Sequence, residues 1–301
     1  MSIAAVIPVH NGETYLHATL ESVIAAGGVD HVYVVLDRCT DGTETITRSF
    51  GTAVEVIESP GVGVSVARNT GALAAEGYEF VYFVDADDLI RIGAVQRLQN
   101  ALEEHREAVA SYGNYDRIAH DGSPYGNIRT DGERHRPSGD LLDLLLRENV
   151  IATNSILIRR EAFLASGGFD PNLTHGEDWH LWTRIAALGP IVHVPSLIFD
   201  YRMREGSATL TGRPSPQKYL EAVDAIYSDP LIRRRRNPWR LRLSRLDAIG
   251  HIFSYMAQQS VRSGRYWDAV KWITRSSLLA PTRAPRRIAI LAKTMLASIR
   301  D

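Results

Sequence analysis

Short apolar runs and amphipathic segments alternate along the first hundred residues of the chain. The apolar runs predict strands over residues 3–9, 31–37, 53–58 and 79–85. Apolar positions three and four residues apart predict helices over 13–26, after the turn at 40–43, over 65–75 and over 91–104. Because these strands are apolar on both faces, the pattern favours an α/β fold with a mainly parallel sheet flanked by helices.

The regular alternation of predicted strands and helices ends after about residue 108. The pattern predicts a strand near 108–113, a glycine-rich hairpin or loop over 113–139, a helix over 140–147, a strand over 154–160, a helix over 177–188 and a short strand pair around 191–202. Beyond about 215 it predicts only helices, with breaks at Pro230, Pro238, Pro281 and Pro285. We therefore expect an α/β domain over 1–210 and a helical extension over 211–301.

Charge is distributed unevenly between these two parts. The 301 residues contain 34 Lys/Arg and 35 Asp/Glu, which gives a formal net charge of −1. Residues 1–228 hold 18 Lys/Arg and 31 Asp/Glu, net −13, whereas 229–301 hold 16 and 4, net +12. An acidic body with a basic tail bears on the choice of binding partners rather than on the fold.

The remaining composition bears on the compartment. The first residues, MSIAAVIPVHN, lack the basic start and long apolar stretch of a signal peptide. No run approaches the roughly 18 apolar residues of a membrane-spanning helix. The single cysteine, Cys39, excludes an internal disulfide and fits a reducing compartment. We expect a cytoplasmic protein.

Three carboxylates, Asp85, Asp87 and Asp88, stand at the end of the predicted strand over 79–85. Acids this close repel one another, so each needs a cation, a hydrogen-bond donor or water. Mg²⁺ and Mn²⁺ prefer oxygen ligands and commonly bind one or two carboxylates together with substrate phosphates. The pattern fits a divalent metal site; the alternative is a solvated loop in which an aspartate caps the next helix.

A glycine-containing loop, GVGVSVARNTGAL (61–73), leads into a predicted helix. Position 66 is valine, so the third glycine of the dinucleotide fingerprint is missing, and the Gly-Lys-Ser/Thr phosphate-loop signature is absent. Arg68 lies in the first turns of the helix, within reach of a phosphate or of a strand-end acid. The alternative is an ordinary surface arginine.

A second acidic motif, Glu177-Asp178-Trp179, opens the helix that follows SGGFDP (166–171). A carboxylate there either caps the helix or acts as a general base facing a pocket, with Trp179 and Trp182 offering flat apolar surface. On these residues alone, the cap is favoured. The ten histidines lack a His-Glu-x-x-His spacing, and the absence of a Gly-x-Ser-x-Gly motif weakens an esterase interpretation.

Taken together and in order, these pieces resemble the family 2 glycosyltransferases of GT-A fold. The resemblance covers about residues 1–210. It rests on seven segments in the expected order: AAVIPVHNGETYLHATLESV (4–23), VVLDRCTDGT (34–43), GVGVSVARNTG (61–71), YFVDADD (82–88), SILIRREAFLASGGFD (155–170), GEDWHLWTRIA (176–186) and YRMREGSAT (201–209).

The resemblance implies a nucleotide-sugar pocket at the carboxyl ends of the strands. It assigns contacts with the donor nucleotide to six residues: Pro8, Val9, Asn11, Asp37, Arg68 and Asp85. Asp37 is expected at the base or ribose, Arg68 at the nucleotide or the acids beside it, and Asp85 near the ribose and metal. Asp87 is expected to ligate the divalent cation, Mn²⁺ or Mg²⁺, that holds the diphosphate.

The resemblance also implies how the sugar is transferred. Asp178 matches the family's catalytic base, and contacts with the acceptor or diphosphate are expected from Glu177, Trp179, Arg202 and Arg204. The base removes the proton of the acceptor hydroxyl as it attacks the anomeric carbon, and the metal holds the charge of the leaving diphosphate. Displacement from one face inverts the anomeric centre.

Two positions depart from the family pattern. Members often carry two adjacent acids after the second strand, where this chain has Leu36-Asp37, so the nucleotide stays open, with UDP favoured. Many members carry a histidine near the end of the catalytic domain that approaches the metal, where this chain has Arg204. Arginine does not ligate a metal, but it can pair directly with a diphosphate.

The basic tail lies outside the resemblance. It contains RRRRNPWRLRLSR (233–245) and a final segment, RRIAILAKTMLASIR (286–300), whose apolar residues share one helical face: Ile288, Leu291, Ala292, Met295 and Ile299. This pattern is typical of a helix at an anionic membrane surface. The alternative is a helical subdomain that packs on the catalytic domain or on a second subunit. No nucleic-acid-binding module accompanies the charge, so no nucleic-acid partner is expected.

The sequence therefore predicts a metal-dependent, inverting hexosyltransferase at the cytoplasmic face of a membrane. Its acceptor would be a glycan, a lipid-linked sugar or a secondary metabolite, and cell-envelope polysaccharide is the expected product class. One rival is a nucleotidyltransferase, which would release pyrophosphate. Another is a non-catalytic scaffold protein that binds a nucleotide sugar. The presence of both Asp87 and Asp178 argues against it, because a site that has lost its activity does not need a base.

Overall fold

The computed structural model describes residues 2–125, 135–203 and 216–298. The chain divides into two compact units, one formed by Met1–Leu141 with Ile151–Arg204 and the other by Leu142–Val150 with Glu205–Asp301. The sequence placed one boundary near residue 210. In the structure, residues 142–150 also belong to the second, helical unit, although their sequence position lies within the α/β part.

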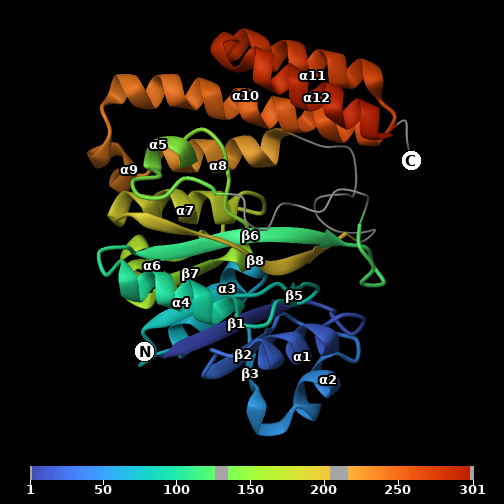
Figure 1. Cartoon of the computed structure of the whole chain (residues 1–301), viewed down its shortest axis with the longest axis vertical. Helices are drawn as coiled ribbons and strands as arrows, with labels where there is room; N and C mark the ends of the chain where they lie inside the picture. Colours follow the sequence, from blue (N-terminus) through green and yellow to red (C-terminus); the bar gives the residue numbers. More distant parts are fainter. Residues whose placement is uncertain (1, 126–134, 204–215, 299–301) are drawn as a thin grey trace. The chain divides into compact units, whose positions relative to one another are not determined.

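An eight-stranded sheet forms the centre of the first unit, in the order β3-β2-β1-β4-β7-β6-β8-β5 (Figure 1). The strands are β1 (Ile3–Val9), β2 (His31–Leu36), β3 (Glu55–Glu58), β4 (Phe80–Phe83), β5 (Leu89–Ile90), β6 (Ala110–Ile118), β7 (Ile156–Arg159) and β8 (Ile191–Arg202). The four strands from β3 to β4 are parallel, as are β6 and β8, whereas β7 runs antiparallel to both neighbours. The predicted α/β fold is confirmed.

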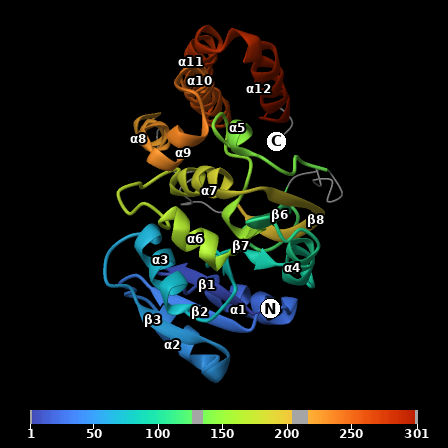
Figure 2. The same cartoon turned by 90° about the vertical axis from the view of Figure 1, so that its left-hand side faces the viewer.

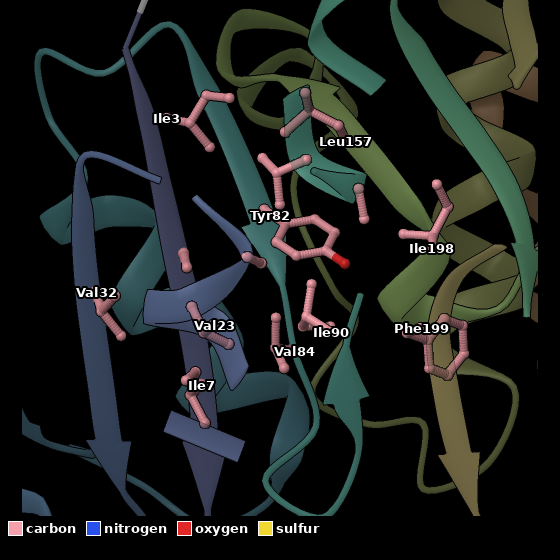
Figure 3. Close-up of a cluster of buried hydrophobic side chains, with 14 of the residues drawn as sticks. Ile3, Ile7, Val23, Val32, Tyr82, Val84, Ile90, Leu157, Ile198 and Phe199 are labelled. Carbon is pink, nitrogen blue, oxygen red and sulfur yellow. The ribbon is translucent and has the colours of Figure 1, made fainter. Parts of the chain in front are cut away.

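Helices cover both faces of this sheet. They are α1 (Leu16–Ala26), α2 (Thr43–Ser49), α3 (Val64–Ala74), α4 (Ala94–Glu104), α6 (Arg160–Ser166) and α7 (Glu177–Leu188). Alternate strand residues such as Ile3, Ile7 and Tyr82 share one core with Val23 of α1 and with α4 (Figure 3).

Helix α3 packs closely against the other face of the sheet. A Cβ atom on Gly71 of α3 would lie 2.4 Å from a methyl of Val6 in β1. A glycine is therefore needed for this helix to lie so close to the sheet.

One difference from the sequence prediction concerns residues 191–202. They form one continuous strand, β8, rather than a short strand pair. Pro195 and Ser196 interrupt the apolar run, but the register with β6 shifts between Gly113 and Asn114, whose partners are Val194 and Leu197. The two intervening residues bulge out of the ladder, so the strand continues past a proline that signals a break.

One short strand and one short α-helix of the first unit were not predicted. β5 has two residues, and α6 begins directly after β7 and spans seven residues. Neither is long enough to display a hydrophobic period of its own. β6, by contrast, extends to Ile118, five residues into the stretch expected to be a hairpin or loop.

The second unit is helical, as predicted. Its helices are α5 (Leu142–Leu145), α8 (Pro216–Ser228), α9 (Pro230–Arg235), α10 (Pro238–Arg262), α11 (Tyr266–Leu279) and α12 (Ala284–Ser298). Pro230 and Pro238 occupy the first positions of α9 and α10, where Asp229 and Asn237 cap the helices through their side chains. Pro285 was expected to break a helix, but it lies in the first turn of α12, where no backbone hydrogen bond is lost.

The last three helices pack together within the helical unit (Figure 2). Leu291 of α12 is buried against Ala257, Val261 and Ala269, which belong to α10 and α11. Ile288 and Leu296 remain 51% and 61% exposed, and Ile299 lies outside the described residues. This packing favours the helical-subdomain alternative, and association with a membrane stays a prediction. Among the residues that the structure describes, no helix has the length and apolarity needed to cross a membrane.

The imidazole of His193 ties the segment around residues 136–139 to β8. Its Nδ1 accepts a hydrogen bond from the Arg136 backbone N–H at 3.1 Å, and its Nε2 lies 3.2 Å from Asn114 Oδ1. With Nδ1 engaged as an acceptor, the neutral ring is required. Burial and the charge of Arg136 lower the pKa of His193 to about 4.

We therefore expect the free energy of unfolding to fall as the pH decreases from about 7 towards 4. The unfolded chain takes up a proton near pH 6.5 that the folded ring refuses, a contribution of about 1–2 kcal/mol at pH 5. Chemical denaturation of wild type and His193→Gln at pH 7 and pH 5 measures it, and the variant should lose less stability. His17→Gln, at an exposed histidine, is the control; equal pH dependence in all three proteins would contradict the assignment.

Candidate active site

The carboxyl ends of the parallel strands bring the predicted donor residues to one edge of the sheet. β1 pairs with β2 on one side and with β4 on the other, so the chain order reverses beside it. Ligands of open α/β sheets bind at such switch points. Pro8 and Val9 end β1, Asp37 follows β2 and Asp85 follows β4 soon after its last residue.

Asp37 is buried, with 6% exposure, and only half satisfied. Its Oδ2 accepts a hydrogen bond from the Gly63 N–H at 2.7 Å, which Gly63 offers from a φ of +100°. Its Oδ1 accepts no hydrogen bond from any described residue, and the nearest cation, Arg38 Nε, is 3.7 Å away. A buried acceptor without a donor is costly. This oxygen therefore suits an N–H or O–H group of a nucleoside.

Two non-glycine residues with positive φ flank this position. Asn11 follows β1 with φ 51°, and Arg38 follows β2 with φ 50°. Asn11 Oδ1 accepts the Thr40 N–H at 2.8 Å and so joins the two loops. Backbone strain of this kind clusters at ligand-binding sites, where the surrounding structure holds it in place.

Arg68 is the centre of the ionic contacts. Its side chain is 5% exposed; Nη2 donates to Asp85 Oδ1 at 2.7 Å and Nη1 to Glu177 Oε1 at 3.0 Å. Burial disfavours the charged guanidinium, but Asp85, Glu177 and Asp178 outweigh it and raise the pKa of Arg68. The arginine thereby joins the end of β4 to the first turn of α7. Arg68 is therefore not an ordinary surface arginine: it is buried and pairs with Asp85, one of the strand-end acids.

Both carboxylate oxygens of Asp88 are used in hydrogen bonds within the protein. It is 1% exposed; Oδ2 accepts from Asn154 Nδ2 at 2.6 Å and Oδ1 from the Arg202 backbone N–H at 2.7 Å. Burial and the charges of Asp87 and Asp85 raise the pKa of Asp88 well above its ordinary value. Asn154 Oδ1 also accepts the Asp85 N–H at 3.0 Å, so one amide holds both ends of the loop.

Arg202 supports the same loop from β8. Its Nε donates to the Asp87 carbonyl at 2.8 Å and its Nη1 to the His120 carbonyl at 2.9 Å, while its guanidinium lies 5.0 Å from the centre of the Tyr15 ring. The sequence proposed an acceptor or diphosphate contact here. In the structure these bonds hold the backbone of the predicted metal ligand. Arg204, the other arginine proposed for that contact, lies outside the described residues.

The start of α7 carries the predicted base. Asp178 is half-buried, and its Oδ1 accepts the Trp179 N–H at 2.7 Å. In the alternative that made Asp178 a general base, Trp179 and Trp182 would offer flat apolar surface to a ligand. The structure does not support that part of the alternative, because their side chains are 3% and 0% exposed and belong to the core. Glu177 of the same motif is paired with Arg68, and the role of Asp178 as a base stays a prediction.

The carboxylates fit a divalent cation that also takes oxygens from its substrate. Asp85 and Asp87 are both half-buried at the end of β4, and carboxylate oxygen is the ligand that Mg²⁺ and Mn²⁺ prefer. Across the described residues, no three His, Cys, Asp or Glu side chains form a complete metal cage. A cation held by these two carboxylates would need further oxygen ligands from another source.

Two asparagines of the site had no signal in the sequence. The sequence predicts Asn154 as the start of a strand, and its two side-chain hydrogen bonds, with Asp88 and with the Asp85 N–H, become visible only in the folded chain. Asn69 lies next to Arg68 and binds both backbone groups of Phe169, accepting its N–H at 2.8 Å and donating to its carbonyl at 2.8 Å. Only glycine fits at position 168, because a Cβ there would lie 2.7 Å from Asn69 Oδ1.

Comparison with known protein families places the chain. The sequence model of the family Glycosyl transferase family 2 matches residues 4–165, which is more than half of the 301 residues. The chain belongs to this family. It is also 27% identical over 242 residues to glycosyltransferase GlyA of Streptococcus pneumoniae, covering 74% of this chain and 33% of GlyA. The chain thus spans about a third of the length of that relative.

Two solved structures share the fold of this chain. TarS 1–349 of S. aureus in complex with UDP-GlcNAc superposes with a TM-score of 0.67 at 17% identity, covering 100% of this chain and 90% of that one. Mannosyltransferase PcManGT of Pyrobaculum calidifontis in complex with GDP-Man and Mn²⁺ gives 0.58 at 16% identity, covering 99% and 85%. At such identities the likeness shows the fold, which is the GT-A fold expected from the sequence.

Removing the Arg68 charge should destabilise the first unit. Arg68→Met leaves Asp85 and Glu177 partly buried without a counter-charge, and we expect the free energy of unfolding to fall by about 2–3 kcal/mol. Arg48→Met is the matched control: Arg48 pairs with Glu44 on the exposed surface of α2, a contact worth less than about 0.5 kcal/mol. Denaturant titration of both variants measures the two losses of unfolding free energy. Equal stabilities would show that Arg68 does not hold the site together.

Proposed function

We propose that the protein transfers a sugar, with inversion, from a nucleoside-diphosphate donor to an acceptor hydroxyl. The observation that carries the proposal is the contact of Arg68 with both Asp85 and Glu177. This contact sets the acids at the end of β4 beside the first turn of α7, where Asp178 lies. The contact supports the proposal because it brings the acids that would face the donor diphosphate close to the candidate base.

The donor would lie across the ends of β1, β2 and β4. Asn11 and Asp37 flank the place for the nucleoside, and the unused Oδ1 of Asp37 suits a donor group of the base or ribose. Among nucleotides we propose UDP, because TarS, whose structure holds UDP-GlcNAc, superposes with the higher TM-score of the two neighbours.

Asp87, with Asp85 beside it, would hold the divalent cation together with oxygens of the donor diphosphate. Bound there, the cation would neutralise the negative charge that gathers on the leaving group. PcManGT, of the same fold, holds Mn²⁺ with its donor. Asp88, Asn154 and Arg202 keep the backbone of residues 85–88 in place and would thereby orient Asp87.

Asp178 would act as the general base. It would take the proton of the acceptor hydroxyl while that oxygen attacks the anomeric carbon from the face opposite the diphosphate. The bond between the anomeric carbon and the phosphate oxygen breaks, and the nucleoside diphosphate leaves. One displacement inverts the anomeric centre. A hexosyl donor and an acceptor from cell-envelope polysaccharide synthesis remain part of the proposal.

Nucleotide binding is expected to need both the metal and Asp87. Thermal unfolding should show stabilisation by UDP with Mn²⁺ that exceeds that by GDP, dTDP or CMP, and that disappears without metal or in Asp87→Asn, because the diphosphate loses its bridge.

Asp121→Asn, at an exposed acid of the same unit, should respond as wild type does. Equal stabilisation of Asp87→Asn and wild type would remove Asp87 from the metal site. No stabilisation by any nucleotide would favour the scaffold alternative.

Loss of the base should lower turnover and spare donor binding. For Asp178→Asn we expect release of UDP from the donor, with water or a sugar as acceptor, to slow by about 10²–10⁴-fold, at unchanged thermal stabilisation by UDP. Asp170→Asn, in the loop before α7, is the control.

Anomer-resolved NMR of the product should show inversion. Unchanged turnover in Asp178→Asn would overturn the assignment of the base. In a separate assay with UTP and a sugar 1-phosphate, release of pyrophosphate would indicate a nucleotidyltransferase.

A further inference from the structure

The helical unit contains a polar cavity of about 60 Å³. Its walls come from residues 147–148, from α10, from the 3-10 turn Pro281–Arg283 and from α12. The volume is several times what one water molecule requires. The cavity can therefore hold a compact group of several heavy atoms.

Positive charge predominates in its walls. The four guanidinium groups of Arg147, Arg283, Arg286 and Arg287 face only two carboxylates, those of Glu148 and Asp247. His251 also lines the cavity, and burial together with the charges of Arg287 and Arg286 lowers its pKa to about 4, against the opposing effect of Glu148. The imidazole is neutral at pH 7, so the walls carry a net charge of +2.

The two carboxylates hold these cations only loosely. Arg147 Nε lies 3.7 Å from Asp247 Oδ2, and Arg286 Nη1 lies 3.5 Å from Glu148 Oε1. Close bonds between a guanidinium and a carboxylate measure about 2.7–2.9 Å. Arg147 Nε is also buried and donates no hydrogen bond to any described residue. The cavity thus holds donors that its own acids leave unused.

Arg287 is fixed in place by neutral groups. Its side chain is 8% exposed, and its Nη2 donates to the Asp247 backbone carbonyl at 2.8 Å while Nη1 approaches the Ser276 carbonyl at 3.4 Å. Gly250 leaves the space for it, since a Cβ there would lie 2.4 Å from Arg287 Nη1. The hydrogen bonds of Arg287 thus go to neutral oxygens, and the charges of Asp247 and Glu148 act on it only at longer range while burial and the neighbouring arginines lower its pKa. A further anion close to this buried cation would therefore be favourable.

We propose that this cavity binds a phosphate-class anion: a phosphomonoester, a phosphodiester or a diphosphate group. Arg147, Arg283 and Arg286 would donate to its oxygens, and Arg287 would supply a fixed positive charge. Guanidinium groups bind phosphate oxygens in this way because their donors form a rigid fork. Two sources share this chemistry, the headgroup of an anionic phospholipid and a phosphate carried by a soluble molecule. The site is separate from the donor pocket and does not depend on the proposed transfer reaction.

Titration calorimetry of the full chain with pyrophosphate, without divalent cations, tests the site. Arg283→Gln/Arg286→Gln removes two cavity donors but spares the structural Arg287, and it should bind pyrophosphate at least about tenfold more weakly than wild type. Arg234→Gln/Arg235→Gln removes the same charge from exposed residues of α9, and it should bind as wild type does. Both variants leave the first unit unchanged, so any signal from that unit is common to them.

A third variant is expected to change affinity in the opposite direction. Glu148→Gln removes a negative charge from the wall and should tighten binding several-fold, a result that misfolding does not produce. In wild type, pyrophosphate should slow hydrogen exchange in residues 283–290. Absence of pyrophosphate binding, an equal loss in both arginine variants, or weaker binding by Glu148→Gln would each overturn the proposal.

Vesicles distinguish the two sources of phosphate. Sedimentation with phosphatidylglycerol vesicles that is lost in Arg283→Gln/Arg286→Gln but kept in Arg234→Gln/Arg235→Gln would assign a lipid headgroup. Pyrophosphate binding at the cavity without sedimentation would assign a soluble phosphate. Phosphatidylcholine vesicles, which carry no net charge, are the background measurement.

Discussion

The candidate site depends on one buried cation, the guanidinium of Arg68. A side chain with 5% exposure keeps its charge only beside opposite charges. Here they come from Asp85 and Glu177, which lie 17 and 109 residues away along the chain. Because α3, the end of β4 and the start of α7 share this contact, none of the three can move without breaking an ion pair in a partly buried place. The donor edge and the proposed base are therefore held as one arrangement.

The same constraint explains how three neighbouring acids coexist. Asp85 is compensated by Arg68, and Asp88 by hydrogen bonds from Asn154 and from the Arg202 backbone. Asp87 is the member for which we propose a divalent cation, and Arg202 and Asn154 hold the backbone on either side of it. Fixing the backbone before a ligand arrives lowers the cost of ordering it during binding. The acidic loop is thus built from donors located on other strands and turns.

The two units handle charge in opposite ways. The first unit surrounds one buried arginine with acids, whereas the helical unit surrounds one buried arginine, Arg287, with further arginines and only two loosely placed carboxylates. The basic character of the tail was evident from the sequence. Which of its arginines share a cavity was not, because Arg147 comes from a segment that precedes β7 in the chain and reaches the others only through the fold.

The sequence by itself determined the elements whose pattern is local. Apolar runs predicted β1 to β4, and seven ordered motifs predicted the family. Pro230 and Pro238 predicted two of the breaks between helices, at which α9 and α10 begin. Only the tertiary structure decided that β8 runs through Pro195, that Trp179 and Trp182 are core residues, and that Asn154 and Arg202 support residues 85–88. The reason is physical: period and capping act within a few residues, whereas burial and hydrogen-bond partners depend on segments that meet only after the chain has folded.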